Sequence, residues 1–470
     1  MALYLLYGLV GLGVARGLTR WRDGLFFIVL LGAVQDPLRK LVPGVPGYLV
    51  LASAVVLGVV MLGLASGSRT WWSTFARHFP SISRAAGWFG LACVPAAVIS
   101  ASYGAGSWLL SLLGAMSYAV LFVAVLVGFY YPRSVRELRR FLSFYCIMTS
   151  VMLTGTGIDY FGFWPNSPLV GTEALGTEWL RFRSGYVIEM IAGFYRSPDV
   201  MGWHAAATVM LATILAMTAR GTSRWFWIAL AALAVAALIV CARRKMFYMP
   251  PVFGAVIMWI YWQSRRPGRM VPVLLGLMVP LVGGAVVSEW LGENEAPTVI
   301  RYYTEGSLEA LDQLEAHGYR ALVTTYAQAG FFGSGLGVAT PGSHHLNVER
   351  PHTWQEGGAS RLLVELGVPG MVAFTALVAS ILLAGWQLTR RHVLARSDLS
   401  TYAVGLFAFF VANGSSLIVS GQILADPVIA TLLGLSLGFV LSLARAPIAL
   451  PVPASPPLPV PAARAPAYVA

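Results

Sequence analysis

Apolar runs of the length that a membrane-crossing helix requires recur along almost the whole chain. A helix needs roughly 20 apolar residues to cross the hydrocarbon core of a bilayer. Of the 470 residues, 57% are hydrophobic and only 11% are charged, whereas about a quarter of the residues in a soluble domain are charged. The longer runs are 48–65, 109–130, 200–218, 225–241, 247–262, 271–288, 362–388, 402–420 and 428–444. The pattern predicts an all-α, polytopic integral membrane protein.

Shorter apolar runs complete the predicted domain, which spans residues 1–445. They are 2–15, 25–34, 88–101 and 141–155. With them we expect 12 or 13 membrane-crossing helices. No basic region precedes the first run, so we expect no cleavable signal peptide. Residues 446–470 are rich in proline and are predicted to form a disordered cytoplasmic tail.

The arginine-rich connectors predict which side of the membrane each loop occupies. Arginines gather in the connectors 133–140, 263–269 and 390–396, and Arg220 and Arg224 flank another short turn. Connectors rich in Lys and Arg normally face the cytoplasm. The net charge of +12 is therefore attributed to sidedness, and no nucleic-acid partner is expected.

Alternation of the spans then places two longer segments, 158–199 and 289–359, on the outer side. Five acidic residues lie in the first segment and nine in the second, fourteen of the chain's 20. A membrane-crossing helix seldom keeps ionisable groups. Chemistry is therefore expected in these two loops, which in a bacterium would face the periplasm from the inner membrane.

Three consecutive cations, Arg243, Arg244 and Lys245, are predicted to lie at the outer face as well. Their position there opposes the usual charge bias. One interpretation is that they are anchors that extend toward the interface, or that the predicted number of spans is wrong. The other is a cation cluster that binds an anion such as a phosphate.

The first outer loop contains Arg181, Arg183 and Arg196 shortly before a span. Arginine suits bidentate contacts to phosphate. Two interpretations stay open, namely a substrate site and a solvated network. The acidic partners in such a network would be Glu173, Glu178, Glu189 and Asp199.

The second outer loop is too long for a bare connector. Ser307 is placed to cap a helix, and a further helix is predicted over 319–329 with Arg320 near its start. A glycine-rich stretch follows, including Gly335 and Gly337. It allows close approach of the backbone to a ligand, or a tight turn back to the membrane.

Histidines and a carboxylate come next. His344, His345 and His352 have poor spacing for zinc, so no metal site is expected. A general base is the preferred role, since histidine or a partly desolvated glutamate such as Glu356 can titrate near neutral pH. Trp354 is either a platform for sugar stacking or an interfacial anchor.

The stretch 362–370, Leu-Leu-Val-Glu-Leu-Gly-Val-Pro-Gly, preceded by Gly-Ser-Gly-Leu-Gly at 333–337, resembles the signature of the O-antigen polymerase and O-antigen ligase superfamily. Arg320 lies upstream of the glycines, where that family has an arginine. Gly193 with Pro198-Asp199 is similar to its Gly-x-x-x-x-Pro-Asn element, and Arg243-Arg244 to its Ser-Arg at the end of a span. The likeness covers roughly residues 180–375.

The chain departs from this family at one position. The family commonly has His-Asn nine residues before the glutamate of its Glu-x-Gly element, and here that position is Glu356-Gly357. Either His352 takes the catalytic role from a shifted turn, or Glu356 does.

The resemblance implies a GT-C-like, metal-independent membrane glycosyltransferase without a cofactor. Its donor would be a polyprenyl-diphosphate-linked glycan, and an acceptor hydroxyl would attack the anomeric carbon. Catalysis would fall to Glu356, His352 and Arg320. Substrate binding would involve Arg181, Arg183, Arg196, Arg243, Arg244, Lys245, Gly335, Gly337 and Trp354.

The resemblance favours a polymerase of lipid-linked repeat units, with a chain-length regulator as a possible partner. The alternatives are a ligase that moves finished glycan to lipid A core or another acceptor, a lipid-linked glycan flippase, and a non-catalytic assembly partner. A flippase would keep charges near the bilayer midplane and often shows repeat symmetry.

Overall fold

Helices make up nearly all of the chain that the structure describes. The computed structural model describes residues 1–183, 185–264, 302–303, 315–346, 348–349, 351, 353, 355, 357–419 and 421–445. For residues 183, 317, 415–416, 418–419 and 422–423 it describes the backbone alone. The predicted span 271–288, the predicted helix at Ser307 and the predicted tail 446–470 lie outside the described residues.

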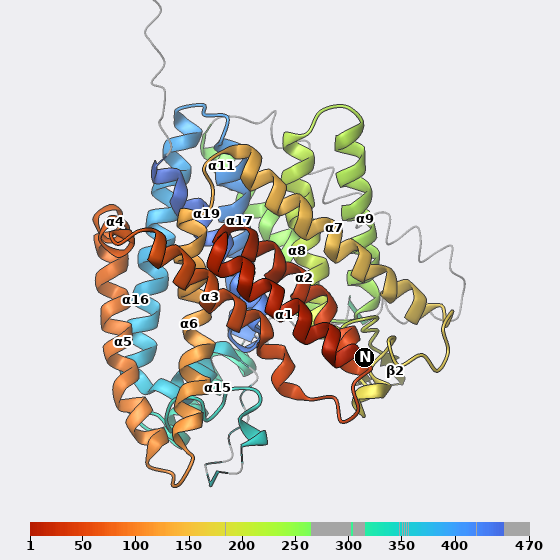
Figure 1. The fold of residues 1–470 in the computed structure, drawn as a ribbon, viewed down its shortest axis with the longest axis vertical. Coiled ribbons are helices and arrows are strands. Elements are labelled where there is room, and N and C mark those ends of the chain that lie inside the picture. Colours follow the sequence, from red (N-terminus) through yellow and green to blue (C-terminus); the bar gives the residue numbers. More distant parts are fainter. Residues whose placement is uncertain are drawn as a thin grey trace, which may run out of the picture.

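Twelve helices of 15 or more residues lie in this part of the chain (Figure 1). They are α1 (Ala2–Thr19), α2 (Trp21–Lys40), α3 (Ala52–Gly67), α5 (Pro80–Ala101), α6 (Trp108–Tyr130), α7 (Val135–Tyr160), α8 (Pro198–Thr218), α9 (Thr222–Val240), α11 (Met249–Gln263), α16 (Gly358–Leu394), α17 (Ser400–Val419) and α19 (Pro427–Ser442). The short helical elements are η1 (Gly47–Leu51), α4 (Trp71–His78), η2 (Glu173–Leu175), α10 (Arg244–Phe247), η4 (Glu315–Arg320), α15 (Ala321–Ala329), η5 (Ser343–His345), α18 (Gln422–Ala425) and η6 (Leu443–Arg445).

Nine helices in the described residues are long and apolar enough to cross a membrane. The predicted runs inside the described residues all fall on helices. This number is lower than the 12 or 13 membrane-crossing helices predicted, because three further helices do not meet the requirements of length and apolarity. Of these, α2 carries charged residues near both ends, α11 has only 15 residues, and the described apolar stretch of α17 is short.

Two helices, α8 and α19, form the centre of the bundle. Almost every residue of each is buried, as expected for a helix that is apolar on all sides. Glycines let α19 approach α6 closely, because a Cβ at Gly438 would meet the carbonyl oxygen of Val125 at 2.3 Å. Polar residues lie where these two helices begin, with Ser197 before α8 and Asp426 before α19.

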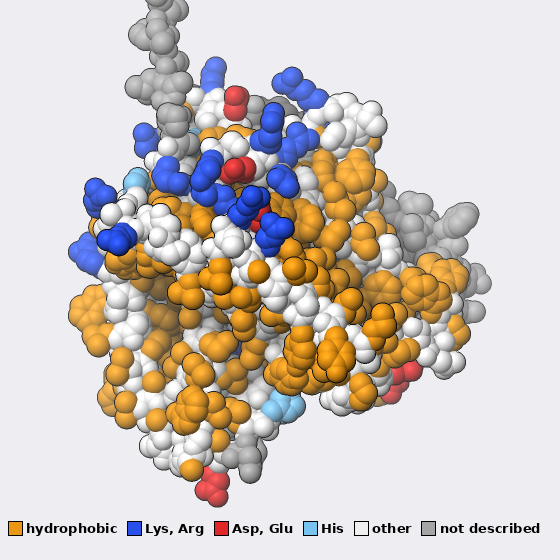
Figure 2. Space-filling model, in the orientation of Figure 1, with side chains coloured by type: hydrophobic (Ala, Val, Ile, Leu, Met, Phe, Trp, Pro, Cys, Tyr) orange, Lys and Arg blue, Asp and Glu red, His pale blue; other side chains and the backbone are white. Residues whose placement is uncertain are grey.

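The two ends of the bundle differ in charge. Figure 2 shows Lys and Arg side chains gathered toward one end, which we call the basic end. There Arg22 donates to the carbonyl of Tyr130 (3.2 Å) and Arg445 to that of Pro132 (3.2 Å). The opposite end carries β2 and α15 (Figure 1), and we call it the loop end. This separation matches the one that the arginine pattern predicts.

A small antiparallel hairpin at the loop end departs from the all-α expectation. Strands β1 (Leu180–Arg183) and β2 (Tyr186–Glu189) pair with Leu180 opposite Glu189. Gly185, with φ of +92°, lies in the turn between them. Arg181 lies on β1 opposite Ile188 and is exposed.

The second loop returns to the bundle through α15 and the start of α16. The helix predicted over 319–329 is found as η4 followed by α15, with Arg320 at the junction. The backbone of α16 is kinked at Gly367, whose φ is +65°. The glycine-rich stretch before α16 packs into this kink.

Candidate functional site

A group of charged residues at the loop end combines one carboxylate with three cations. We call Asp199, Arg243, Arg244 and Lys245 the Asp199 cluster. The Asp199 carboxylate forms ion pairs with Arg243 Nη2 (2.8 Å) and with Lys245 Nζ (2.7 Å). Arg243 and Lys245 thus share the Asp199 carboxylate, and Arg244 lies between them in the chain.

Aromatic rings partly shield these cations from solvent. The guanidinium carbon of Arg243 lies 4.9 Å from the ring centroid of Trp179, and that of Arg244 lies 4.0 Å from the ring centroid of Tyr302. Arg244 is buried, while Arg243 and Lys245 are only partly exposed. Charge in such a setting is less screened than at an open surface, so it attracts an anion more strongly.

Local sequence explains why the cluster forms. Ser197 caps α8 by accepting from the N–H of Val200 (3.3 Å), which places Asp199 in the first turn of the helix. The chain from α9 to α10 crosses this turn closely, because a Cβ at Gly202 would meet Cys241 Sγ at 3.0 Å. The cations at 243–245 are thereby held against the start of α8.

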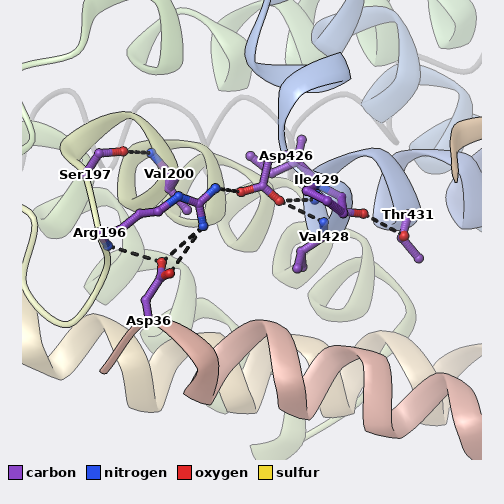
Figure 3. A network of polar contacts seen from close by, with 9 residues as sticks. Asp36, Arg196, Ser197, Val200, Asp426, Val428, Ile429 and Thr431 are labelled. Atoms are coloured by element: carbon purple, nitrogen blue, oxygen red, sulfur yellow. Dashed lines mark hydrogen bonds and ion pairs between the residues drawn. The ribbon is translucent and has the colours of Figure 1, made fainter. Parts of the chain in front are cut away.

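Arg196 lies between two buried carboxylates (Figure 3). Its backbone N–H donates to Asp36 Oδ2 (3.1 Å), Nη1 pairs with Asp36 Oδ1 (3.3 Å), and Nη2 pairs with Asp426 Oδ2. Asp426 Oδ1 caps α19 by accepting from Val428 (2.8 Å) and Ile429 (3.0 Å). This Arg196 triad joins α2, the first loop and α19.

The triad differs from both sequence interpretations of Arg196. One arginine between two carboxylates has no positive charge left for a phosphate, so the geometry disfavours the predicted substrate contact. The predicted solvated network is also not found for Arg196, because its partners Asp36 and Asp426 are buried and come from other helices. Burial would raise the pKa of the Asp426 carboxyl, but the charge of Arg196 and the N–H of Ile429 hold that pKa below its ordinary value.

Lys40 ties the first loop to α2. Its buried ammonium donates to three carbonyl oxygens, those of Leu169 (3.3 Å), Gly171 (2.6 Å) and Gly193 (3.0 Å). Three acceptors match the three N–H groups of an ammonium. Lys40 is therefore occupied in positioning the loop.

A second buried network lies at the start of α16. Glu365 is fully buried and accepts from Tyr118 Oη (2.7 Å) and Thr340 Oγ1 (2.8 Å), with Arg361 Nε at 3.4 Å. Arg361 Nη2 also donates to Ser117 Oγ (2.7 Å). The network fastens the turn before α16 to α6, and a buried charge of this kind requires such partners.

Gly335 and Gly337 pack against helices. A Cβ at Gly335 would meet Ser100 Oγ at 2.6 Å, and a Cβ at Gly337 would meet the carbonyl oxygen of Leu110 at 2.0 Å. The backbone N–H of Leu336 also donates to the carbonyl of Ala96 (2.9 Å). The close approach at these glycines is thus to α5 and α6, which favours the tight turn over the predicted ligand contact.

The remaining predicted residues are either exposed or outside the described residues. Arg320 is 71% exposed and pairs with Glu315 (2.8 Å). The side chain of Arg183 and the residues His352, Trp354 and Glu356 lie outside the described residues. Their neighbour Gln355 accepts from Thr325 Oγ1 (3.1 Å), so the chain at 355 lies beside α15.

Within the described residues, His344 and His345 belong to no group of three or more side chains that could bind a metal ion. His344 and His345 contact each other with ring centroids 4.0 Å apart. A Cβ at Gly47 would lie 3.4 Å from His345 Nε2. This places η5 beside η1.

Sequence reasoning missed several residues that organise the site. They are Asp36, Lys40, Tyr118, Arg361, Glu365 and Asp426. One signal was available. Ionisable residues inside apolar runs need partners, and Asp36, Glu365 and Asp426 each lie in or beside such a run.

The chain matches no protein-family model, and a comparison with curated proteins finds no match.

Proposed function

We propose that the protein is a multi-pass bacterial inner-membrane glycosyltransferase. It polymerises polyprenyl-diphosphate-linked repeat units into surface polysaccharide at the periplasmic face. The long apolar helices support membrane insertion. The gathering of arginines at one end supports a cytoplasmic basic end and a periplasmic loop end.

One observation carries the proposal, namely that three consecutive cations lie against the start of α8 at the loop end. Arg243 and Lys245 both pair with Asp199, and Arg244 lies against Tyr302. A lipid-linked donor presents its diphosphate at the membrane surface, where this cluster lies in the proposed topology. Arginines are suited to bidentate contacts with phosphate oxygens.

The proposed reaction breaks one bond and forms one. The acceptor hydroxyl oxygen attacks the anomeric carbon of the donor, and the bond from that carbon to the diphosphate oxygen breaks. The lipid diphosphate leaves with the bonding electron pair, and the Asp199 cluster stabilises the charge that develops on it. The proton of the hydroxyl passes to a general base.

The general base is proposed to lie in the segment around Gln355. Glu356 or His352 would take the proton, with Glu356 preferred. The contact between Gln355 and Thr325 holds the described part of this segment beside α15 at the loop end. That is the end where the Asp199 cluster lies.

The proposal is tested by reconstituting the purified protein in liposomes with a polyprenyl-diphosphate-linked repeat unit. We expect a ladder of products that differ by one repeat and remain lipid-linked, in the presence and absence of a chelator. Transfer only to an added lipid A core acceptor would indicate a ligase. Movement of the donor between leaflets without a new glycosidic bond would indicate a transporter. Either of these outcomes would overturn the proposed polymerase.

A further inference from the structure

Helix α15 exposes three chemically different faces. At about 100° per residue, Val323 and Tyr326 lie about 60° apart on one face, and both are exposed (51% and 48%). Thr324 and Gln328 lie about 40° apart on a second face, and both are exposed and polar. Thr325 is buried on the third face, toward the rest of the protein.

The apolar face of α15 continues into two phenylalanines. Phe331 and Phe332 follow the helix, are both exposed, and contact each other edge to face with ring centroids 5.1 Å apart. Tyr319, just before α15, is exposed as well. A contiguous exposed apolar surface of this kind usually marks a site of contact with a protein, a membrane or a ligand.

The backbone beneath these rings is fixed to the bundle. The carbonyl of Phe331 accepts from the N–H of Val368 (2.8 Å) at the kink of α16, and the N–H of Ser334 donates to the carbonyl of Val364 (2.6 Å). Tyr103 Oη donates to the carbonyl of Ser334 (2.6 Å), beyond the end of α5. The aromatic surface therefore has a set position relative to α5 and α16.

The same two helices carry the exposed apolar side chains that would face lipid. On α5 these are Trp88, Leu91, Val94 and Val98, and on α16 they include Val372, about one turn beyond Val368. Figure 2 shows apolar side chains covering much of the face between the two ends. The surface of α15 thus lies next to the end of this apolar belt.

We propose that α15 and the Phe331–Phe332 turn form an interfacial element that inserts its apolar face into the outer leaflet of the membrane. Val323, Tyr326 and the two phenylalanines contact acyl chains and the headgroup boundary, while Thr324 and Gln328 face water. A helix with one apolar and one polar exposed face adopts this in-plane position, and tyrosine is enriched at that depth. The consequence is that the chain at Gln355, which contacts α15, is held at the membrane surface.

The occupant of this surface is lipid rather than a glycan. Val323, beside Tyr326 on the exposed apolar face of α15, is aliphatic and offers no ring on which a sugar could stack. Continuity with the apolar belt of α5 and α16 also favours lipid. The inference rests on the membrane insertion in the proposed function but not on glycosyl transfer.

The test is spin-label accessibility in liposomes. Cysteines at 323, 326, 324 and 328 are introduced one at a time with Cys93→Ala, since Cys146 and Cys241 are buried, and the parent without an added cysteine is the blank. Collision with oxygen reports lipid, and collision with a water-soluble nickel chelate reports water. Labels at Val98 on α5 and at Thr177 in the first loop provide the lipid and water references.

We expect the labels at 323 and 326 to match the lipid reference, and those at 324 and 328 to match the water reference. Four labels that all match the water reference would overturn the inference, and so would four that all match lipid. If the label at Val98 itself is in water, membrane insertion and hence the proposed function fail. A label at 326 that is in water and becomes protected by soluble repeat-unit oligosaccharide would show a sugar platform instead.

Discussion

At the scale of single residues, two buried carboxylates set Arg196 apart from the arginines proposed to bind an anion. Arg196 faces Asp36 and Asp426, so its charge is more than neutralised. Arg243 shares Asp199 with Lys245, beside Arg244. The sequence shows only that arginines are present, because it does not show which distant carboxylates reach them.

The first prediction concerns geometry at Arg244. Lysine keeps the charge but loses the planar, bidentate fork. We expect Arg244→Lys to lower the polymerisation rate in proteoliposomes, by up to about the 10²-fold that removal of one donor to a developing oxyanion costs. The control is Arg139→Lys, a partly exposed arginine beside Ser223 at the basic end. Equal rates for wild type and Arg244→Lys would make Arg244 a structural anchor.

The second prediction concerns acid stability through Asp426. The folded protein holds the pKa of this carboxyl below its ordinary value. Its contribution to stability is therefore present above the unfolded pKa of about 3.9 and is lost as the pH falls through the lower folded pKa. We expect the thermal midpoint in detergent to drop below about pH 4 in wild type.

Asp426→Asn provides the comparison for this pH dependence. The amide still offers an oxygen to cap α19, but it does not titrate. We expect a lower midpoint at pH 7 than in wild type, and a shallower loss between pH 5 and pH 3. The same slope in both proteins would show that Asp426 does not govern acid unfolding.

At the scale of elements, the apolar runs in the sequence predicted the positions of most helices. The polar residues next to these runs were a weaker guide to where each helix begins and ends. Pro198 begins α8 as expected of a proline in a first turn. The hairpin was missed, although Ser184-Gly185 between alternating residues is a two-residue turn signal. Each strand has only four residues and carries charged side chains, so the apolar pattern that revealed the helices did not reveal the strands.

The glycine-rich turn offers a third prediction with a matched control. Gly337 and Gly330 both have positive φ, but a Cβ at Gly337 would meet the carbonyl oxygen of Leu110, whereas none of the described atoms lies within 4 Å at Gly330. We expect Gly330→Ala to cost about 1–3 kcal/mol of unfolding free energy, from the strained backbone alone. Gly337→Ala should cost about 1–3 kcal/mol more, because overpacking is added.

Thermal unfolding of the two variants in one detergent measures this difference. Equal losses for Gly330→Ala and Gly337→Ala would contradict the packing role assigned to Gly337. A larger loss at Gly330 would reverse it.

At the scale of the whole molecule, the separation of charge between the two ends was predictable, and the polar networks at the loop end were not. Arginine-rich connectors can be recognised locally in the sequence. The Arg196 triad joins residues 36, 196 and 426, and the Glu365 network joins Tyr118 to Thr340 and Arg361. Such long-range partners appear only once the helices are packed.

The fourth prediction tests sidedness. Cysteines placed at Thr177 and His344, both exposed at the loop end, should react with an impermeant thiol reagent in intact spheroplasts. A cysteine at Ser223, exposed at the basic end beside Arg139, should react only after lysis. The reverse pattern of labelling would place the Asp199 cluster in the cytoplasm.

The central claim is that the Asp199 cluster binds the diphosphate of a lipid donor, and binding of polyprenyl diphosphate by the reconstituted protein tests it most directly. Wild type is compared with Arg243→Gln, which removes a cation, and with Asp199→Asn, which removes the competing carboxylate. If the cluster is an anion site, Arg243→Gln weakens binding, and Asp199→Asn leaves it equal or stronger. If both variants bind wild-type levels of the lipid, or if both lose binding to the same extent, the cluster is a structural ion pair and the account is contradicted.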